Sequence, residues 1–270
     1  MATTGADAKV AANEAGVVDL AVVRRLEAAG FRAWPAECVS YDGTWAVRLT
    51  AAHPAKRLNC VNPLDPADVG QIGERVERLR RTFAAFGRPL TFRLSPLAGA
   101  GLSHHFDRQG WSRFGESIVM RLDLDTSVVT QSIDQIPLRD VARFVSSAVA
   151  VREGDPQLRN GLACVIGSIR AQTGLFLHES EGQPVASAVC VADGRLAGLF
   201  EVATAATKRR HGHARRLVQS ALKWARQQGA SQAWLQVEAE NVAARSLYDS
   251  IGFRELYRYH YRRTPGAADE

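Results

Sequence analysis

A short basic segment in the second half of the chain has the residue types of an anion-binding site. Lys208, Arg209 and Arg210 stand just before Gly212, and the preceding residues 199–204 are apolar and β-branched, which is typical of a strand. Apolar residues then recur at helical spacing, namely Ala214, Leu217, Val218, Ala221, Leu222 and Ala225. The first turn of a helix presents backbone N–H groups without intrahelical partners, and the helix dipole adds positive charge there. The segment therefore predicts a polyphosphate site between a strand and a helix.

The spacing of the glycines distinguishes between phosphate-binding motifs. The sequence contains neither the Gly-x-x-x-x-Gly-Lys-Ser/Thr loop of nucleotide hydrolases nor the Gly-x-Gly-x-x-Gly motif of dinucleotide sites. The pattern present is Arg209-x-x-Gly212-x-Ala214, followed by Asn241, Tyr248 and Gly252-Phe253. Together these residues resemble the GNAT-type N-acetyltransferases, whose acyl-coenzyme A motif reads Arg or Gln, two residues, Gly, one residue, then Gly or Ala. An ordinary helix start with a solvated basic rim is the alternative.

The resemblance implies a set of cofactor contacts. The pyrophosphate of acetyl-coenzyme A would lie on the backbone N–H groups of residues 210–215. The pantetheine arm would pair with the main chain of the preceding strand, which requires that strand to splay away from the strand after the helix. The cofactor-binding residues predicted in this way are Val202, Ala203, Thr204, Arg209, Arg210, His211, Gly212, His213, Ala214, Arg215, Asn241 and Tyr248. Acetyl-coenzyme A is the expected cosubstrate, and no metal is expected.

The same resemblance assigns chemical roles. It implies direct attack of an amine on the thioester, without a covalent enzyme intermediate, so that coenzyme A leaves as a thiolate. Tyr248 is the predicted general acid, because a tyrosine with a pKa of about 10 keeps its proton at neutral pH; the alternative is a tyrosine packed only for its ring. Glu201 is ranked first as the base, with His178, Glu238 and a water chain as alternatives. Asn241 either caps the following helix or binds the cofactor arm.

A fixed spacing between similar segments indicates that the chain is duplicated. The pattern Phe-Asp-x-x-Gly-Trp that begins at Phe106 matches Tyr-Asp-x-x-Gly-Phe at Tyr248, an offset of 142 residues (248 − 106 = 142). The same offset relates Gly87 to Gly229 and Gly70 to Gly212. We therefore interpret the chain as two GNAT-like halves in tandem. The alternative is a coincidental repeat and an unrelated α+β domain in the first half.

The first half lacks the residues that would bind an anion. By the offset, Ala67 stands opposite the motif arginine, and Phe106 stands opposite the tyrosine but lacks its hydroxyl. Asp65 and Asp68 put negative charge where a pyrophosphate would lie. The first half is therefore expected to be a structural partner that shapes the substrate cleft.

The expected fold class is α/β, more narrowly α+β: two tandem GNAT-like domains, each a mixed, mostly antiparallel sheet flanked by helices. The predicted boundaries are a disordered lead over residues 1–16, a degenerate GNAT-like domain over 17–124, a catalytic domain over 125–265 and a tail over 266–270. Residues 126–136 are the expected linker and 151–160 a substrate loop. Periodicity predicts helices over 17–29 (ended by Gly30), 67–86, 102–108, 137–151, 158–170 and after Gly212. Strands are predicted over 31–40, 45–49, 56–61, 90–94, 117–124, 173–178, 185–192, 199–204 and 233–237.

The composition of the chain argues against metal-binding, disulfide-linked, membrane-spanning and nucleic-acid-binding proteins. The four cysteines, Cys38, Cys60, Cys164 and Cys190, lie far apart in the sequence, which predicts buried thiols and argues against zinc or a disulfide framework. No apolar run is long enough for a membrane helix and the first residues do not resemble a secretion signal, so a cytoplasmic protein is expected. The net charge of +6 gathers at the predicted cofactor loop or is diluted along helices, so we expect no nucleic-acid partner. The sequence is compatible with a monomer or a homodimer.

The predicted function is an N-acetyltransferase that moves an acetyl group from acetyl-coenzyme A to a primary amine of a small molecule or peptide. The alternative is a non-catalytic acyl-coenzyme A-binding regulatory module. Both bind the cofactor, and they differ at Tyr248, because only the enzyme needs its hydroxyl. No pattern in the sequence names the acceptor.

Overall fold

The computed structural model of the protein describes residues 18–124 and 135–265. The first range contains α1 (Leu20–Ala33), β1 (Cys38–Asp42), β2 (Trp45–Leu49), η1 (Lys56–Leu58), β3 (Cys60–Pro63), α2 (Ile72–Ala85), β4 (Thr91–Leu94), η2 (Pro96–Ala98), α3 (Gly99–Arg108) and β5 (Ser112–Asp123). The second contains α5 (Val141–Val151), α6 (Leu158–Gly167), β6 (Gln172–Ser180), β7 (Gln183–Asp193), β8 (Leu196–Thr204), η3 (Ala206–Lys208), α7 (His213–Gln227), β9 (Gln232–Glu238), α8 (Val242–Ile251) and β10 (Arg254–Arg263). The predicted lead, the predicted tail and most of the predicted linker lie outside the described residues.

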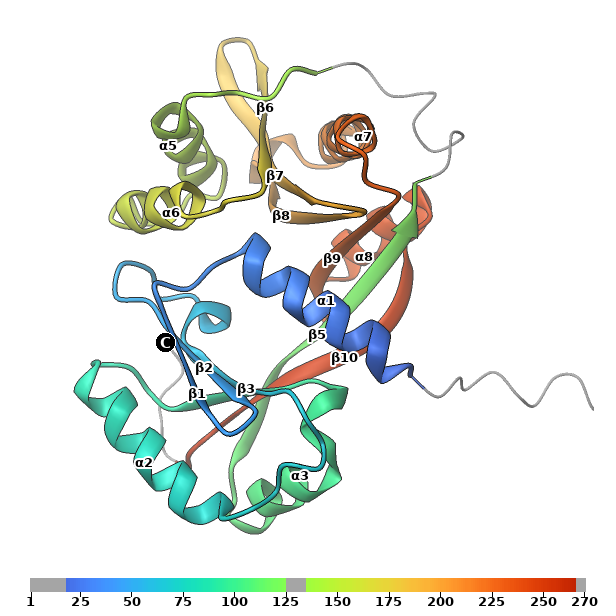
Figure 1. Cartoon of the computed structure of the whole chain (residues 1–270). Coiled ribbons are helices and arrows are strands. Elements are labelled where there is room, and N and C mark those ends of the chain that lie inside the picture. Colours follow the sequence, from blue (N-terminus) through green and yellow to red (C-terminus); the bar gives the residue numbers. More distant parts are fainter. Residues whose placement is uncertain (1–17, 125–134, 266–270) are drawn as a thin grey trace, which may run out of the picture.

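The strands of both halves join in one ten-stranded sheet with helices on both faces (Figure 1). The strand order is β1-β2-β3-β4-β10-β5-β9-β8-β7-β6. The pairs β3–β4 and β8–β9 are parallel, and the other neighbours are antiparallel. This arrangement confirms the predicted class, a mixed and mostly antiparallel sheet flanked by helices.

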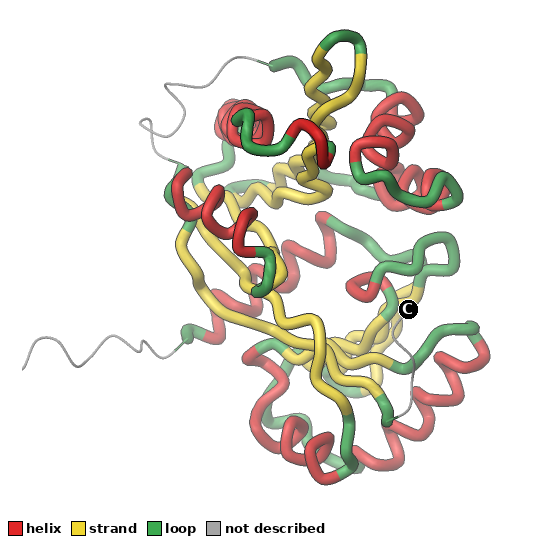
Figure 2. The backbone as a smooth tube through the Cα atoms, turned by 180° about the vertical axis from the view of Figure 1, so that it is seen from behind, coloured by secondary structure: helices red, strands yellow, loops and turns green. Residues whose placement is uncertain are grey.

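The last strand of each half pairs with a strand of the other half. β5 pairs with β9 from Ser117↔Glu238 to Asp123↔Gln232. β10 lies between β4 and β5 and pairs with both. Figure 1, and Figure 2 from behind, show β5 and β10 as long strands that cross the middle of the molecule. The two sequence repeats are therefore linked by backbone hydrogen bonds as well as by the chain.

Alternating side chains divide the core between the two faces of the sheet. On β9, Trp234 packs into the cluster built with α1, α5 and α6, whereas Ala233 and Leu235 pack into the cluster built with α7 and α8. Successive side chains of a strand point to opposite faces, so these two sets of helices cover opposite faces. In the first half, Val61 and Phe92 pack with α2 and α3 in a third cluster.

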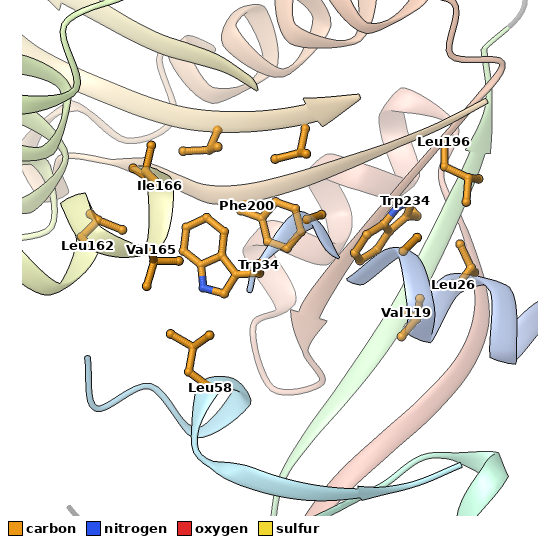
Figure 3. Close-up of a cluster of buried hydrophobic side chains, with 14 of the residues drawn as sticks. Leu26, Trp34, Leu58, Val119, Leu162, Val165, Ile166, Leu196, Phe200 and Trp234 are labelled. Carbon is orange, nitrogen blue, oxygen red and sulfur yellow. The ribbon is translucent and has the colours of Figure 1, made fainter. Parts of the chain in front are cut away.

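Both halves contribute side chains to the core on the α1 face. Trp34 stacks on Phe200 with ring centroids 4.9 Å apart, and Phe200 meets Trp234 edge-on at 5.4 Å. Figure 3 shows these rings with Leu26, Leu58 and Val119 from the first half and Leu162, Val165, Ile166 and Leu196 from the second. Burying each large apolar side chain stabilises the fold by about 1.5–3 kcal/mol. This core would be incomplete in either half alone.

A buried ion pair crosses the same core. The guanidinium of Arg93 on β4 binds both carboxylate oxygens of Glu27 on α1, and the Tyr257 hydroxyl on β10 donates to Glu27 Oε1 at 2.7 Å. Both charged side chains are 3% exposed. Removing one partner of such a pair leaves an uncompensated buried charge, which costs about 3–5 kcal/mol. The pair thereby fixes α1 against strands of both halves.

Several predicted boundaries are wrong: α2 begins at Ile72 rather than at residue 67, and residues 31–33, predicted to be strand, belong to α1. α1 continues through Gly30, because the Trp34 N–H donates to the Gly30 carbonyl at 3.0 Å. A Cβ at Gly30 would stand 3.4 Å from the Trp234 ring, an ordinary van der Waals contact, so α1 packs against β9 at this position. α5 begins at Val141 rather than at residue 137, because Asp140 Oδ1 accepts from the Arg143 N–H at 2.9 Å and caps the helix.

A predicted strand and part of the cysteine prediction are also wrong. Residues 56–58 form a 3-10 turn, because the Leu58 N–H donates to the Ala55 carbonyl at 2.9 Å instead of to a neighbouring strand. The cysteines are free, but Cys38 and Cys164 are exposed, and only the other two are buried as predicted. Spacing in the sequence does not determine exposure, so the predicted burial of Cys38 and Cys164 is wrong.

Candidate active site

The predicted polyphosphate site is a loop of bare backbone at the start of α7. After η3, Arg210 (φ 66°) and Gly212 (φ 78°) turn the chain into the helix. The backbone N–H groups of residues 210–215, which we call the cradle, donate to no group among the described residues. A Cβ built on Gly212 would meet nothing within 4 Å. Successive free N–H groups at a helix N-terminus form an anion-binding concavity.

Imidazole and guanidinium groups surround the cradle. The ring of His213 lies 5.0 Å from that of His178 on β6 and 6.0 Å from that of His211. Burial lowers the pKa of His213, and the neighbouring imidazoles and cations lower it further. The Arg215 guanidinium donates to Ser250 Oγ at 2.5 Å and so ties α7 to the end of α8. His178, one of the predicted base candidates, therefore lies beside the cradle.

β8 and β9 separate next to the cradle. Their parallel pairing runs from Leu196↔Gln232 to Leu199↔Leu235, although β8 extends to Thr204 and β9 to Glu238. Residues 200–204 and 236–238 therefore flank a gap in the sheet. An extended ligand can add itself as a strand to an edge of this kind.

A bulge marks the point where β8 enters the gap. The register with β7 shifts between Ser187 and Val189, so that Glu201 and Val202 stand opposite a single residue. Glu201 has a φ of 52°, and Ser187 Oγ donates to its carbonyl at 3.2 Å. A bulge takes one residue out of the ladder and re-aims its neighbours. Main-chain groups of β8 are thereby released beside the gap.

Two arginines from different halves hold the Glu201 carboxylate. Arg152, which follows α5, places Nη1 2.8 Å from Oε2, and Arg57 in η1 places Nη2 3.8 Å from Oε1. The Glu201 side chain is 11% exposed. The carboxylate ranked first as a base therefore also connects the predicted substrate loop to the first half.

Tyr248 has its ring in the core and its hydroxyl unpartnered. The ring meets Phe253 edge-on with centroids 5.8 Å apart, and no group within the described ranges hydrogen-bonds the hydroxyl. Burial raises the pKa of Tyr248 to about 12, against the opposing charge of Arg152. The hydroxyl is therefore a protonated donor at neutral pH.

The helix that carries Tyr248 is capped at both ends. Asn241 Oδ1 accepts from the Ala244 N–H at 3.0 Å, which satisfies one of the free N–H groups of the first turn. Gly252, with a φ of 114°, ends the helix. Of the two roles left open for Asn241, the structure shows the cap.

A cavity of about 200 Å³ adjoins the gap. Its walls are residues 236–238 of β9, residues 55–57 around η1, and residues of β5 and β10 that include Ser117, Tyr259 and Tyr261. Tyr259 and Tyr261 belong to the core of the α1 face, whereas Tyr248 belongs to that of α7 and α8. The cavity and Tyr248 therefore lie on opposite faces of the sheet.

Sequence reasoning missed most of this cavity. Glu238 is among the predicted base candidates, whereas the other lining residues Lys56, Arg57, Tyr259 and Tyr261 have no predicted role. Tyr259 and Tyr261 line it from β10, which pairs with β4 and β5, whereas Lys56 and Arg57 line it from η1. The single available signal was the pair of adjacent cations at 56–57, in a segment predicted to be a strand.

The matching helix start in the first half holds a carboxylate of its own. Asp68, which precedes α2, accepts from Arg75 Nη1 at 2.7 Å and from the N–H and hydroxyl of Thr44 at 2.8 Å each. These bonds, chiefly that from Arg75, lower the pKa of Asp68 to about 2. The carboxylate is therefore ionised at neutral pH and repels a second anion.

The sequence matches a protein family described as "Probable histone acetyltransferase Rv0428c C-terminal" over residues 20–262. The chain belongs to this acetyltransferase family. The match covers both repeats, so the Rv0428c C-terminal family includes the half with the motif and the half without it.

Individual proteins agree with the family match. The "Uncharacterized N-acetyltransferase YobR" of Bacillus subtilis is 25% identical over 250 residues, 89% of this chain and 98% of that protein. The [ribosomal protein bS18]-alanine N-acetyltransferase of Escherichia coli K12 is 36% identical over 75 residues, 27% of this chain and 51% of that protein. The predicted membership of the GNAT superfamily is confirmed, and the protein is an acetyltransferase of this type.

Solved structures show the same fold. A GCN5-related N-acetyltransferase from Kribbella flavida superposes with a TM-score of 0.68 at 20% identity, covering 91% of this chain and 96% of that chain. A tandem GNAT protein from the clavulanic acid biosynthesis pathway has a TM-score of 0.59 at 14% identity, covering 93% and 89%. The second comparison supports the interpretation of the chain as tandem halves.

Residues 18–124 and 135–265 contain neither a membrane-spanning helix nor a cluster of metal ligands. None of the helices there combines the length and apolar character that a bilayer crossing requires. Their histidine, cysteine and acidic side chains form no group of three or more that could hold a metal ion.

Proposed function

We propose that this protein transfers an acetyl group from acetyl-coenzyme A to a primary amine of a small molecule or peptide by direct attack. The observation that carries the proposal is the open cradle at residues 210–215, set beside a gap between two parallel strands. A pyrophosphate needs the first feature, and an extended arm that ends in a thioester needs the second. Membership of an acetyltransferase family supports the same reaction.

The cradle and β8 hold the acyl donor in this proposal. The N–H groups of residues 210–215 bind the pyrophosphate, and the absence of a Cβ at Gly212 leaves room for it. Val202, Ala203 and Thr204 pair with the amides of the pantetheine arm. Arg209, His211, His213 and Ala214 complete the rim, Arg215 braces it through α8, and Asn241 fixes the start of the helix that carries Tyr248.

The transfer step makes one bond and breaks one. The neutral amine attacks the thioester carbonyl, the C–N bond forms, and the C–S bond breaks to release a thiolate. The backbone N–H of Val202, beside the bulge, stabilises the carbonyl oxygen as it becomes negative. Tyr248 donates to the departing sulfur on its side of the sheet.

We propose Glu238 as the acceptor of the amine proton in place of Glu201. Glu201 is already bound by Arg152 at 2.8 Å. Glu238 lines the cavity beside the gap, is exposed, and forms no ion pair within the described ranges. In this arrangement Glu201 is a positioning residue that anchors the loop after α5.

Thiol release in the presence of acetyl-coenzyme A and a library of amines tests the proposal. We expect free thiol to form only when a suitable amine is present, with one acetylated amine for each thiol released. Calorimetric binding of coenzyme A without transfer to any amine would favour the non-catalytic binding module. Absence of binding would refute the cradle.

A further inference from the structure

The cavity beside the gap carries both signs of charge. Lys56 and Arg57 line it from η1, and Glu238 lines it from the end of β9. Arg57 contacts Glu201 only at 3.8 Å, and an acceptor with only an amine would leave both cations without a ligand partner. Their presence suggests a second, anionic group on the acceptor.

Aromatic rings support these two cations without neutralising them. Lys56 Nζ lies 5.4 Å from the ring centroid of Phe114 and 5.5 Å from that of Tyr261. The Arg57 guanidinium lies 5.6 Å from the ring centroid of Trp34. Such contacts hold a cation in place while its N–H donors remain available.

Carboxylates within the structure also leave these cations largely free. No carboxylate of the described residues forms an ion pair with Lys56. Arg57 has a single long contact of 3.8 Å with Glu201, which is bound more closely by Arg152 at 2.8 Å. A ligand carboxylate at this place would therefore gain two charge-assisted partners.

Resting on the acetyltransferase function proposed above, we propose that the acceptor is a small amino acid-type molecule that carries a carboxylate as well as its amine. The carboxylate binds Lys56 and Arg57, and Glu238 receives the amine beside the gap. The cavity, at about 200 Å³, is smaller than the clefts of roughly 300–1,000 Å³ that hold drug-sized ligands. The first half thus supplies the groups that select the acceptor.

The same charges disfavour a polycationic peptide. Further positive charge on the acceptor would face Lys56 and Arg57 across the cavity, and like charges in apposition weaken binding and exclude wrong partners. The cavity therefore suits a small acceptor with a carboxylate better than a basic histone tail, although the family is described as a probable histone acetyltransferase.

Matched acceptors test the proposal through the ratio of their kcat/KM values. Thiol release is measured with an amino acid, with its amide, with the amine that lacks the carboxyl group, and with an amine that carries a phosphate in its place. We expect the amino acid to exceed its amide about 10- to 100-fold in wild-type protein, the range of a charge-assisted hydrogen bond. In Lys56→Gln and in Arg57→Gln this ratio should fall severalfold, and in the double variant it should approach one.

Arg24→Gln is the matched control, because Arg24 is exposed on α1 and lies outside the cavity. It should keep the wild-type ratio, and thermal unfolding of every variant checks the fold. Equal rates with amino acid and amide, a preference for a lysine-rich peptide, or a phosphate-bearing amine that exceeds the amino acid would overturn the carboxylate assignment. Those results would leave acetyl transfer itself standing, whereas failure of every amine would count against the proposed function.

Discussion

Replacing Tyr248 by Phe removes one hydroxyl and keeps the ring that packs against Phe253. The hydroxyl has a pKa of about 12, whereas a thiol has a pKa of about 8.5. The two pKa values differ by about 3.5, and each pKa unit corresponds to about 1.36 kcal/mol. Complete proton transfer from the hydroxyl to a thiolate is therefore unfavourable by about 5 kcal/mol. In the proposed mechanism Tyr248 therefore acts chiefly as a hydrogen-bond donor to the sulfur as negative charge develops on it.

The size of the expected effect follows from that role. A hydrogen bond to a charged group contributes about 1.5–3 kcal/mol, which is about a 10- to 150-fold change in rate. Because the bond strengthens only as the C–S bond breaks, Tyr248→Phe should lower kcat and kcat/KM together and change the KM for acetyl-coenzyme A by no more than about twofold. The active form is the protonated one, present below the pKa of about 12, so Tyr248 should produce no loss of rate between about pH 7 and 10.

The assay is thiol release under saturating amine, with coenzyme A affinity measured separately by calorimetry. Tyr257→Phe is the matched control: it also removes a buried hydroxyl, but one that donates to Glu27 in the shared core at 2.7 Å. That variant should lose stability and retain kcat. A Tyr248→Phe variant with wild-type kcat, or one that has lost coenzyme A binding, would refute the reasoning.

Further predictions concern stability. Glu27→Ala should lower the free energy of unfolding by about 3–5 kcal/mol, because it leaves a buried guanidinium unpaired. Glu77→Ala, at an ion pair 59% exposed on the glutamate side, should change it by less than about 1 kcal/mol in the same denaturant titration; equal losses would contradict the buried network. Gly161→Ala should destabilise by about 1–3 kcal/mol, since its Cβ would stand 1.9 Å from the Ala52 carbonyl oxygen and push α6 away from the first half. Gly167→Ala at the end of the same helix meets nothing within 4 Å and should be close to neutral, so a Gly161→Ala variant as stable as Gly167→Ala would show that the halves do not meet there.

The strand and helix that flank the motif in the second half were predictable because their residues are contiguous in the sequence. The strand predicted at 199–204 lies within β8, and the helix predicted after Gly212 is α7. A strand, a positive-φ glycine and an amphipathic helix carry their signals in local spacing. The offset of the repeat also placed Asp68 beside the matching helix start of the first half, where Arg75 binds its carboxylate.

Features that depend on distant pairing were not predictable. Nothing in residues 117–124 states that this strand pairs with β9, because register depends on a partner more than 100 residues away. The cavity was unpredictable for the same reason, since its walls come from four separated segments. Gly30 predicts a helix stop because propensity is local, whereas α1 continues to Ala33 and the Trp34 N–H donates to the Gly30 carbonyl.

Calorimetric titration of coenzyme A into the wild-type protein and Gly212→Ala tests the central claim most directly. Gly87→Ala is the matched control, because Gly87 has a similar φ of 70° against 78° for Gly212, also faces open space, and lies outside the cradle. We predict one binding event per chain in wild type, unchanged in Gly87→Ala and weakened about tenfold or more in Gly212→Ala, where the added Cβ enters the space needed by the phosphates. Coenzyme A binding to Gly212→Ala with the affinity of the wild-type protein would contradict the account.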